Sequence, residues 1–228
     1  MKKYIIAIIL SLSLLTAPLS IHTQTISPMV DKARSLYIPM GCSSPAEIYV
    51  IGSAFPVDKH LLMTAAHVYC RPEEGTPVAW IANKWVDLSK TTTFVATDID
   101  VMLFDLQYVT FKKWATFRKP VIGEYVGGYG AAFGLKEGVG TFGVISFIGK
   151  VEGMHVALFT NQSIGGHSGS ALVGSDGKVV SMVNFGWPDY YLSTQVGGGT
   201  TGDVLGKATQ VVQAYLKKKH LSTSDTPQ

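Results

Sequence analysis

A serine flanked by glycines is the residue of this chain best suited to act as a nucleophile. Ser168 lies in the segment GGHSGS, residues 165–170. Glycine allows a tight backbone with exposed N–H groups, because it reaches positive φ at little cost and places no side chain against a ligand. Such N–H groups can stabilise the oxyanion that forms when a hydroxyl attacks a carbonyl carbon. Glycine- and serine-rich turns are common, so the chemistry depends on partners elsewhere in the chain.

A histidine and an aspartate are candidates to activate this hydroxyl. His67 follows Thr64-Ala65-Ala66 at the expected exit of a strand, where small side chains leave room for the ring to face a cleft. Asp100 precedes the apolar run 101–104, so its carboxylate is expected at the mouth of a buried strand. A buried carboxylate needs a partner or hydrogen bonds to remain ionised. We favour Asp100 as the buried acid and assign Asp98 to the turn that enters the strand.

The elements that must position these residues have the pattern of short strands bounded by turns. A hairpin is expected from Ile48–Ile51, through a turn at residues 56–59, to Leu61–Thr64. Further strands are expected at Val78–Ala82, Trp85–Leu88, Thr92–Ala96, Glu124–Tyr129, Thr141–Ile148, His155–Thr160, Ala171–Val173, Val179–Phe185 and Tyr190–Val196. Apolar residues at helical spacing from Asp203 to Lys219 predict one helix, with Asp203 as its N-cap.

The N-terminus has the pattern of a secretory signal peptide. Lys2 and Lys3 form a short basic region, and the apolar run 4–15 is about as long as a signal-peptide core and short for a membrane span. Residues 1–20 are therefore expected to direct export, to a secreted, periplasmic or extracellular location. An uncleaved anchor is the alternative, and the cleavage position stays open. Residues 21–40 contain two prolines and no sustained periodicity, which predicts a mobile connector or a short pro-segment.

The two cysteines and the net charge bear on three questions: a disulfide, a metal site and a nucleic acid partner. Cys42 and Cys70 are the only cysteines, and in an exported chain such a pair is expected to be bridged. A metal site using His67 and Cys70 is disfavoured, because the chain has no second C-x-x-C and no H-E-x-x-H motif. We therefore expect no metal and no other cofactor. The net charge of +3 is too small to indicate nucleic acid, so the basic and aromatic residues 107–121 are interpreted as a solvated linker.

The order of these features resembles that of the trypsin/chymotrypsin-like serine proteases. The resemblance rests on T-A-A-H ending at His67, on Asp100 before an apolar strand and on G-x-S-G-S around Ser168, and it covers roughly residues 40–219. It implies an all-β fold of two packed six-stranded antiparallel Greek-key β-barrels with a C-terminal α-helix. The implied peptidase domain is 41–219, with a first barrel at about 41–108, a linker at about 109–122, a second barrel at about 123–202, a helix at 203–219 and a polar tail at 220–228.

The resemblance also implies a role for each site residue. His67 would take the proton of Ser168 as the hydroxyl attacks a peptide carbonyl, and Asp100 would orient the imidazole and stabilise the imidazolium. The N–H groups of Gly166 and Ser168 would form the oxyanion hole. The substrate-binding residues implied by similarity are Gln162, Ser163, Asn184, Phe185, Gly186 and Gly198, and they favour an uncharged residue before the scissile bond. An α/β-hydrolase is disfavoured, because it needs G-x-S-x-G and the order Ser, Asp, His.

One position departs from the family pattern. Many members have an aspartate before the nucleophile that pairs with a newly released N-terminus, whereas this chain has His167 there and no recognisable activation segment. We therefore expect a bacterial- or viral-type member that is not a zymogen. His167 is expected to be a turn residue that points away from the triad, with a second titrating group near the oxyanion hole as the alternative.

The expected function is that of a secreted, monomeric serine endopeptidase. It would act on protein or peptide substrates through an acyl-enzyme, with no nucleic acid partner and no stable membrane association after signal removal. Two alternatives are a catalytically silent trypsin-like binding protein and a self-processing protease with a single target. A binding protein of that kind would usually lack a member of the triad, and none is missing here.

Overall fold

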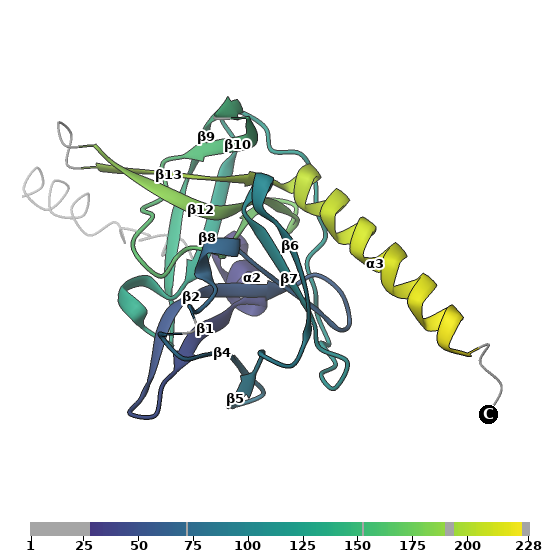
Figure 1. Cartoon of the computed structure of the whole chain (residues 1–228). Coiled ribbons are helices and arrows are strands. Elements are labelled where there is room, and N and C mark those ends of the chain that lie inside the picture. Colours follow the sequence, from purple (N-terminus) through teal and green to yellow (C-terminus); the bar gives the residue numbers. More distant parts are fainter. Residues whose placement is uncertain (1–27, 72, 152, 190–193, 225–228) are drawn as a thin grey trace, which may run out of the picture.

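The structure is a computed structural model, and it describes residues 28–71, 73–151, 153–189 and 194–224. The predicted signal peptide, residues 1–20, and the end of the predicted tail lie outside these ranges. Two β-sheets form the body of the protein, and one long helix extends away from them (Figure 1). Within the described ranges, no helix combines the length and the apolar character needed to cross a membrane.

The first sheet is built from the N-terminal half of the chain. Its strands are β1 (Ile38–Ser43), β2 (Ile48–Pro56), β3 (Leu61–Thr64), β4 (Thr76–Ile81), β5 (Lys84–Asp87), β6 (Thr92–Ala96) and β7 (Val101–Asp105), in the spatial order β5-β4-β1-β2-β3-β7-β6. The sheet is open, with β5 and β6 at its edges. The expected closed six-stranded barrel is therefore wrong in detail, because β1 adds a seventh strand and the edges do not pair.

The second sheet closes into the predicted six-stranded antiparallel barrel. It contains β8 (Tyr125–Gly130), β9 (Val139–Val151), β10 (Met154–Phe159), β11 (Ala171–Gly174), β12 (Val179–Asp189) and β13 (Thr194–Thr201), in the closed order β10-β13-β12-β11-β8-β9. Its interior is filled by seven buried side chains, those of Val126, Ile145, Ala157, Phe159, Leu172, Val180 and Val183. The all-β, two-sheet fold class predicted from the sequence is confirmed.

The expected connector at residues 21–40 is wrong for its described part. Residues Pro28–Leu36 form helix α2, which packs on β8 and β11, and β1 begins at Ile38. The apolar positions Val30, Ala33 and Leu36 lie on one helical face and are buried. Gly127 on β8 allows the close approach, since a Cβ there would lie 2.6 Å from the Val30 nitrogen. The folded domain therefore includes residues 28–40.

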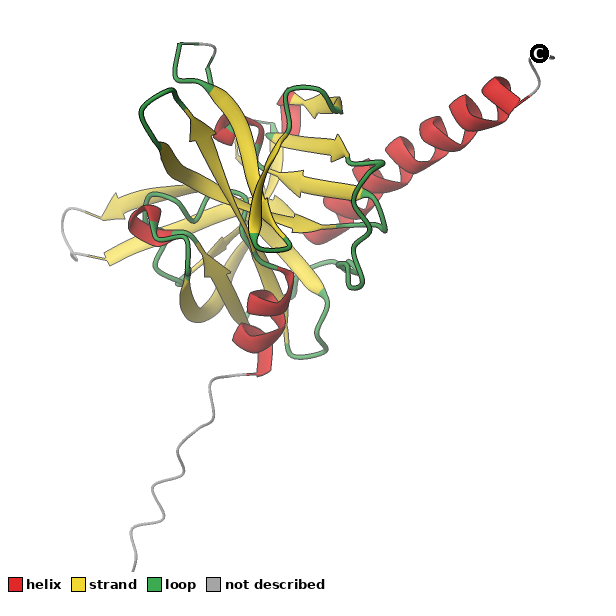
Figure 2. Cartoon of the chain, turned by 90° about the horizontal axis from the view of Figure 1, so that it is seen from below, coloured by secondary structure: helices red, strands yellow, loops and turns green. Residues whose placement is uncertain are grey.

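The C-terminal helix α3 spans Gly202–Ser224, slightly longer than predicted. Leu205 and Val212 are buried, whereas Val211 and Tyr215 are exposed. The far end of the helix extends away from the sheets (Figure 2). The helix begins one residue before Asp203, so the predicted N-cap is wrong and this aspartate lies in the first turn.

The predicted disulfide between Cys42 and Cys70 is confirmed. Cys42 lies on β1, and Cys70 follows the 3-10 helix η1 (Ala66–Val68), which carries His67. Both cysteines are buried, and their Cα atoms are 5.7 Å apart. The bridge therefore ties the segment after His67 to the first sheet.

Loss of this bridge should destabilise the protein. Replacing Cys42 and Cys70 together by alanine should lower the free energy of unfolding by about 3–4 kcal/mol, because the unfolded chain loses a loop closure. Urea denaturation of the double variant and of the oxidised and reduced protein measures the effect. Equal unfolding midpoints for the variant and the oxidised protein would show that the bridge adds no stability.

Candidate active site

His67 and Asp100 meet at the ends of two paired strands. His67 follows β3 and Asp100 precedes β7, and these strands pair in antiparallel register. The ring Nδ1 lies 2.8 Å from Asp100 Oδ2, and the His67 backbone N–H donates to Oδ1 at 3.0 Å. Asp98 is exposed and makes no such contact. The aspartate that orients the His67 ring in this structure is therefore Asp100.

The backbone of Asp100 is in the left-handed region, with φ 50° and ψ 51°. This region is uncommon for residues other than glycine and costs conformational energy, although aspartate tolerates it better than most. Its carbonyl oxygen accepts hydrogen bonds from the Ala66 N–H at 3.2 Å and from the Asn184 side-chain amide at 2.9 Å. These contacts hold the carboxylate in position at the end of the first sheet.

Asn184 is a residue whose role sequence reasoning did not identify. Its Nδ2 donates to Asp100 Oδ2 at 2.8 Å, and its Oδ1 accepts the Thr200 N–H at 2.7 Å. Val183 pairs with Gly199 and Phe185 with Gly198, so Asn184 is the extra residue of a β-bulge in β12. A bulge can redirect a side chain, and here it directs the amide toward the carboxylate. Asn184 was predicted as substrate-binding, and its side chain is instead bound to Asp100.

The electrostatics of the pair favour an ionised Asp100. Burial raises the pKa of this carboxyl, but hydrogen bonds from the His67 ring, the Asn184 amide and the His67 backbone N–H outweigh burial. The pKa of Asp100 therefore lies below its ordinary value. An ionised carboxylate accepts the proton on Nδ1, which leaves Nε2 of the neutral ring as the acceptor.

In the triad expected from the sequence, removal of the Asn184 amide should weaken catalysis while His67, Asp100 and Ser168 all remain. Asn184→Leu should lower kcat by about 10–100-fold, since a hydrogen bond to a charged group contributes about 1.5–3 kcal/mol. Steady-state kinetics measures this loss. Ser181→Ala is the matched control, because its buried hydroxyl on the same strand donates to the Thr200 carbonyl and does not touch Asp100. Equal kinetics in the two variants would contradict the role of Asn184.

The same substitution has a pH signature. The folded-state pKa of Asp100 lies below its unfolded value, so the stability from this group is present above the unfolded pKa and is lost as pH falls. Asn184→Leu reduces that pKa shift. The stability difference between variant and wild type, measured by denaturant unfolding, should therefore be larger at neutral pH than at acid pH.

Ser168 lies on a loop held between the two sheets. Its carbonyl accepts the Ser53 N–H of β2 at 2.9 Å, and the Gly169 N–H donates to the Val183 carbonyl of β12 at 2.7 Å. A Cβ on Gly52 would contact both Val68, which is next to His67, and the Ser168 carbonyl. The segment with His67 and the loop with Ser168 therefore both lie against β2 at Gly52. No hydrogen bond joins Ser168 Oγ to the His67 ring in this structure. Such bonds are often long without substrate and tighten when it binds.

Two N–H groups beside the hydroxyl are free to bind an anion. Neither Gly166 nor Ser168 donates its N–H to another described residue. The Gly165 carbonyl accepts the Phe133 N–H at 2.9 Å, and the Gly166 carbonyl accepts the Ser53 hydroxyl at 2.8 Å. A trans peptide directs its C=O and N–H to opposite sides. Holding the Gly165 carbonyl therefore directs the Gly166 N–H away from Phe133.

Gly166 needs to be glycine in this arrangement. Its φ is +97°, and a Cβ would lie 2.0 Å from the Ala131 carbonyl oxygen. The residues predicted as the oxyanion hole are thus brought together on one loop with their donors unused.

The other predicted substrate-binding residues gather where β12 faces β13. Ser163 is buried, its hydroxyl has no partner among the described residues, and a Cβ on Gly186 would lie 2.9 Å from its carbonyl. The Phe185 ring lies over Gly198, where a Cβ would come within 2.2 Å of it, and Gln162 is exposed. Ser163 therefore lies against β12 and β13, five residues before Ser168, whereas the side-chain amide of Asn184 is occupied by Asp100 and Thr200.

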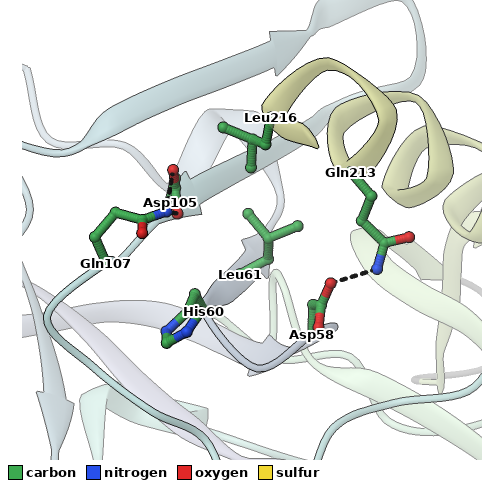
Figure 3. A pocket seen from close by; sticks show the side chains of 7 residues that line it. All are labelled: Asp58, His60, Leu61, Asp105, Gln107, Gln213 and Leu216. Atoms are coloured by element: carbon green, nitrogen blue, oxygen red, sulfur yellow. Dashed lines mark hydrogen bonds between the residues drawn. The ribbon is translucent and has the colours of Figure 1, made fainter. Parts of the chain in front are cut away.

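A separate cavity of about 190 Å³ lies beneath helix α3 (Figure 3). Its polar side chains already have partners, since Asp58 accepts from Gln213, Asp105 accepts from Gln107, and the His60 ring contacts the Val109 carbonyl. The Asp58–Gln213 bond therefore fastens α3 to the hairpin between β2 and β3. Within the described part of the chain, no three histidine, cysteine, aspartate or glutamate side chains form a metal site.

Comparisons with known proteins agree with the fold. No family model and no curated protein matches the sequence. The active form of the Rv3671c protease from M. tuberculosis matches with a TM-score of 0.66 and 17% identity, over 80% of this chain and 82% of that chain. The HtrA-type protease AlgW with tripeptide matches with a TM-score of 0.64 and 16% identity, over 81% of this chain and 62% of that one.

A third solved structure gives the same result. The serine endoprotease from Yersinia pestis matches with a TM-score of 0.61 and 18% identity, over 83% of this chain and 65% of that chain. All three solved structures resemble this chain in fold at only 16–18% sequence identity. The chain therefore has the fold of the chymotrypsin-like serine proteases.

Proposed function

We propose that this chain is a serine endopeptidase that uses Ser168 as nucleophile, His67 as general base and acid, and Asp100 to orient the imidazole. The observation that carries the proposal is the loop on which Ser168 lies, because it presents two unused N–H groups next to the hydroxyl. The hydrogen bond between His67 and Asp100 supports it, since it leaves Nε2 as the acceptor of a proton. The fold shared with solved proteases adds the expected reaction class.

In the proposed reaction His67 first accepts a proton and then gives it back, once while the acyl-enzyme forms and once while it is hydrolysed. As Ser168 Oγ attacks the peptide carbonyl carbon, its proton moves to His67 Nε2, and the carbonyl becomes an oxyanion held by the Gly166 and Ser168 N–H groups. Collapse of this intermediate breaks the C–N bond, and His67 returns the proton to the leaving amine. Water then attacks the acyl-enzyme while His67 Nε2 takes its proton, the ester bond between the acyl carbon and Ser168 Oγ breaks, and His67 returns the proton to Ser168 as the carboxylic acid leaves.

Labelling with a fluorophosphonate tests the proposal directly. An activated serine displaces fluoride and forms a stable phosphonyl ester, so mass spectrometry should find one adduct on the peptide that contains Ser168. A folded protein that takes no label would overturn the endopeptidase proposal and leave the catalytically silent binding protein. Digestion of a peptide library then separates a general endopeptidase, which cleaves many peptides, from a self-processing protease, which cleaves none.

We also propose that the enzyme acts outside the cytoplasm on protein or peptide substrates, as a monomer. The basic and apolar pattern of residues 1–20 supports export, and the disulfide suits an oxidising compartment. Mass spectrometry of protein from the periplasm or the medium should show a chain that lacks this segment. Recovery of the full chain from the cytoplasm alone would contradict export.

Activity should be higher at about pH 8 than at about pH 5, because general-base catalysis needs a neutral imidazole. Protonated His67 has no acceptor for the Ser168 proton, so only the neutral ring supports turnover. Asp100 stays ionised in this range, because its pKa lies below the ordinary aspartate value. Measured kcat/KM should therefore follow a single ionisation. A flat profile across this range would contradict general-base catalysis by His67.

A further inference from the structure

His167, the residue before the nucleophile, is buried beneath the loop and takes no part in the reaction proposed above. It is 2% exposed, so the turn residue expected at this position is buried. The His167 backbone N–H donates to the Ile164 carbonyl at 2.9 Å, and its ring Nδ1 accepts the Ile164 N–H at 3.2 Å. The backbone and the ring of His167 therefore each form a hydrogen bond with Ile164, and these two bonds join the ends of the four-residue turn 164–167.

This turn determines where the Gly166 N–H points. Residues 165 and 166 are its two corner residues, and the positive φ of Gly166 fits the third position of a tight turn. If the corner peptide between them rotated by half a turn, the Gly165 carbonyl would occupy the side on which an oxyanion binds. The Phe133 N–H opposes this rotation because it holds the Gly165 carbonyl, and the two bonds between His167 and Ile164 fix the ends of the turn, which sets where its corner peptide lies.

We propose that His167 is a positioning residue, whose neutral imidazole accepts the Ile164 N–H and keeps the turn 164–167 in the conformation that presents the Gly166 N–H to the oxyanion. This inference rests on the proposed function, because an oxyanion hole matters only if Ser168 attacks a carbonyl.

The surroundings of the ring favour a neutral acceptor. A Cβ built on Gly130 would lie within 2.9 Å of the ring Cδ2 and of two hydroxyl oxygens, those of Ser53 and Ser170. This edge of the ring therefore faces uncharged groups. Nε2 makes no well-aligned hydrogen bond with a described residue, and its polar neighbour is the backbone of Val139. Burial lowers the pKa of His167, and the Val139 backbone offsets only part of that. Protonation would turn Nδ1 into a donor facing the Ile164 N–H, which would break the bond.

Two isosteric amides test the proposal. An asparagine places its carbonyl oxygen near the position of Nδ1, whereas a glutamine reaches the position of Nε2. His167→Asn should therefore keep kcat within about fivefold of wild type, because an acceptor for the Ile164 N–H remains. His167→Gln should lower kcat by about 10²-fold or more with KM nearly unchanged, because one oxyanion donor is misplaced. Affinity for a peptide trifluoromethyl ketone, which forms an oxyanion on Ser168, should fall with kcat.

Ser170→Ala is the matched control, since its hydroxyl is buried beside the same ring, has no partner among the described residues and lies outside the turn. It should leave kcat unchanged. Equal kcat and ketone affinity in wild type, His167→Asn and His167→Gln would overturn the role of His167 while the proposed function stands. An equal loss in both variants, with thermal unfolding unchanged, would also overturn it. Failure of the wild type to take the fluorophosphonate would instead overturn the proposed function.

Discussion

Replacing Ser168 by alanine should abolish peptide hydrolysis and leave the fold intact. In the proposed reaction the hydroxyl forms the acyl-enzyme, so its removal should lower kcat by about 10⁴-fold or more, with a small residual rate from the oxyanion donors and substrate binding. The fold should persist, because Ser168 is held by its carbonyl bond to Ser53 and not by its side chain. Hydrolysis of a fluorogenic peptide and thermal unfolding measure the two effects.

Substitutions at His67 and Ser170 test whether the loss is specific to Ser168 and its proposed base. His67→Ala should cause a loss of the same size, and the double variant should lose little more, because residues that act as a unit are not additive. Ser170→Ala, two positions from the nucleophile, should retain full activity and full labelling. Turnover by Ser168→Ala above a thousandth of the wild-type rate would assign the nucleophile to another residue.

The strands that follow simple patterns are predictable from the sequence. The strand Thr92–Ala96 has the predicted bounds, and the hairpin from β2 to β3 was expected from its apolar runs and its turn. These elements are encoded locally, because alternating side chains face the core and turn residues separate them. The closed second barrel followed from the family resemblance and not from the strand pattern.

Elements that depend on tertiary contacts were missed. Helix α2 is nine residues long, and a helix of this length gains most of its stability from packing. Its partner surface includes Gly127, whose missing side chain cannot be linked to α2 from sequence alone. Strand β1 contains Pro39 and Gly41, which disfavour strands locally, and yet it pairs with β2 and β4 on both sides. Pairing in the sheet outweighs local propensity here.

In the candidate site, too, residues with a local motif were predicted, whereas contacts that depend on the fold were missed. Motifs indicated His67, Asp100 and Ser168, because each residue type has a distinctive local sequence. Asn184 was predicted as a substrate-binding position, and the bond from its side-chain amide to Asp100 was not foreseen, since a bulge in β12 depends on the register with β13 and has no sequence signal of its own. His167 was expected to face away from the site, and only the folded loop shows its ring closing the turn.

Replacing Asp100 by asparagine should reduce kcat by about 10⁴-fold while KM changes little. The asparagine side chain is of similar size, but its amide can donate to His67 Nδ1. The ring would then carry its proton on Nε2 and could not accept one from Ser168. The new NH2 group would also take the place of Oδ2, where it would face the donating amide of Asn184, whereas the remaining oxygen at the Oδ1 position could still accept the His67 backbone N–H.

Asp98→Asn is the control that separates the two candidate acids. Asp98 is exposed and two residues away, so its substitution should leave kcat within about twofold of wild type, as is usual for surface positions. A large loss in Asp98→Asn with normal turnover in Asp100→Asn would reverse the assignment of the acid. If both variants kept full activity, the His67 ring would need no carboxylate to set its tautomer, and catalysis would then depend on Ser168, His67 and the oxyanion loop alone.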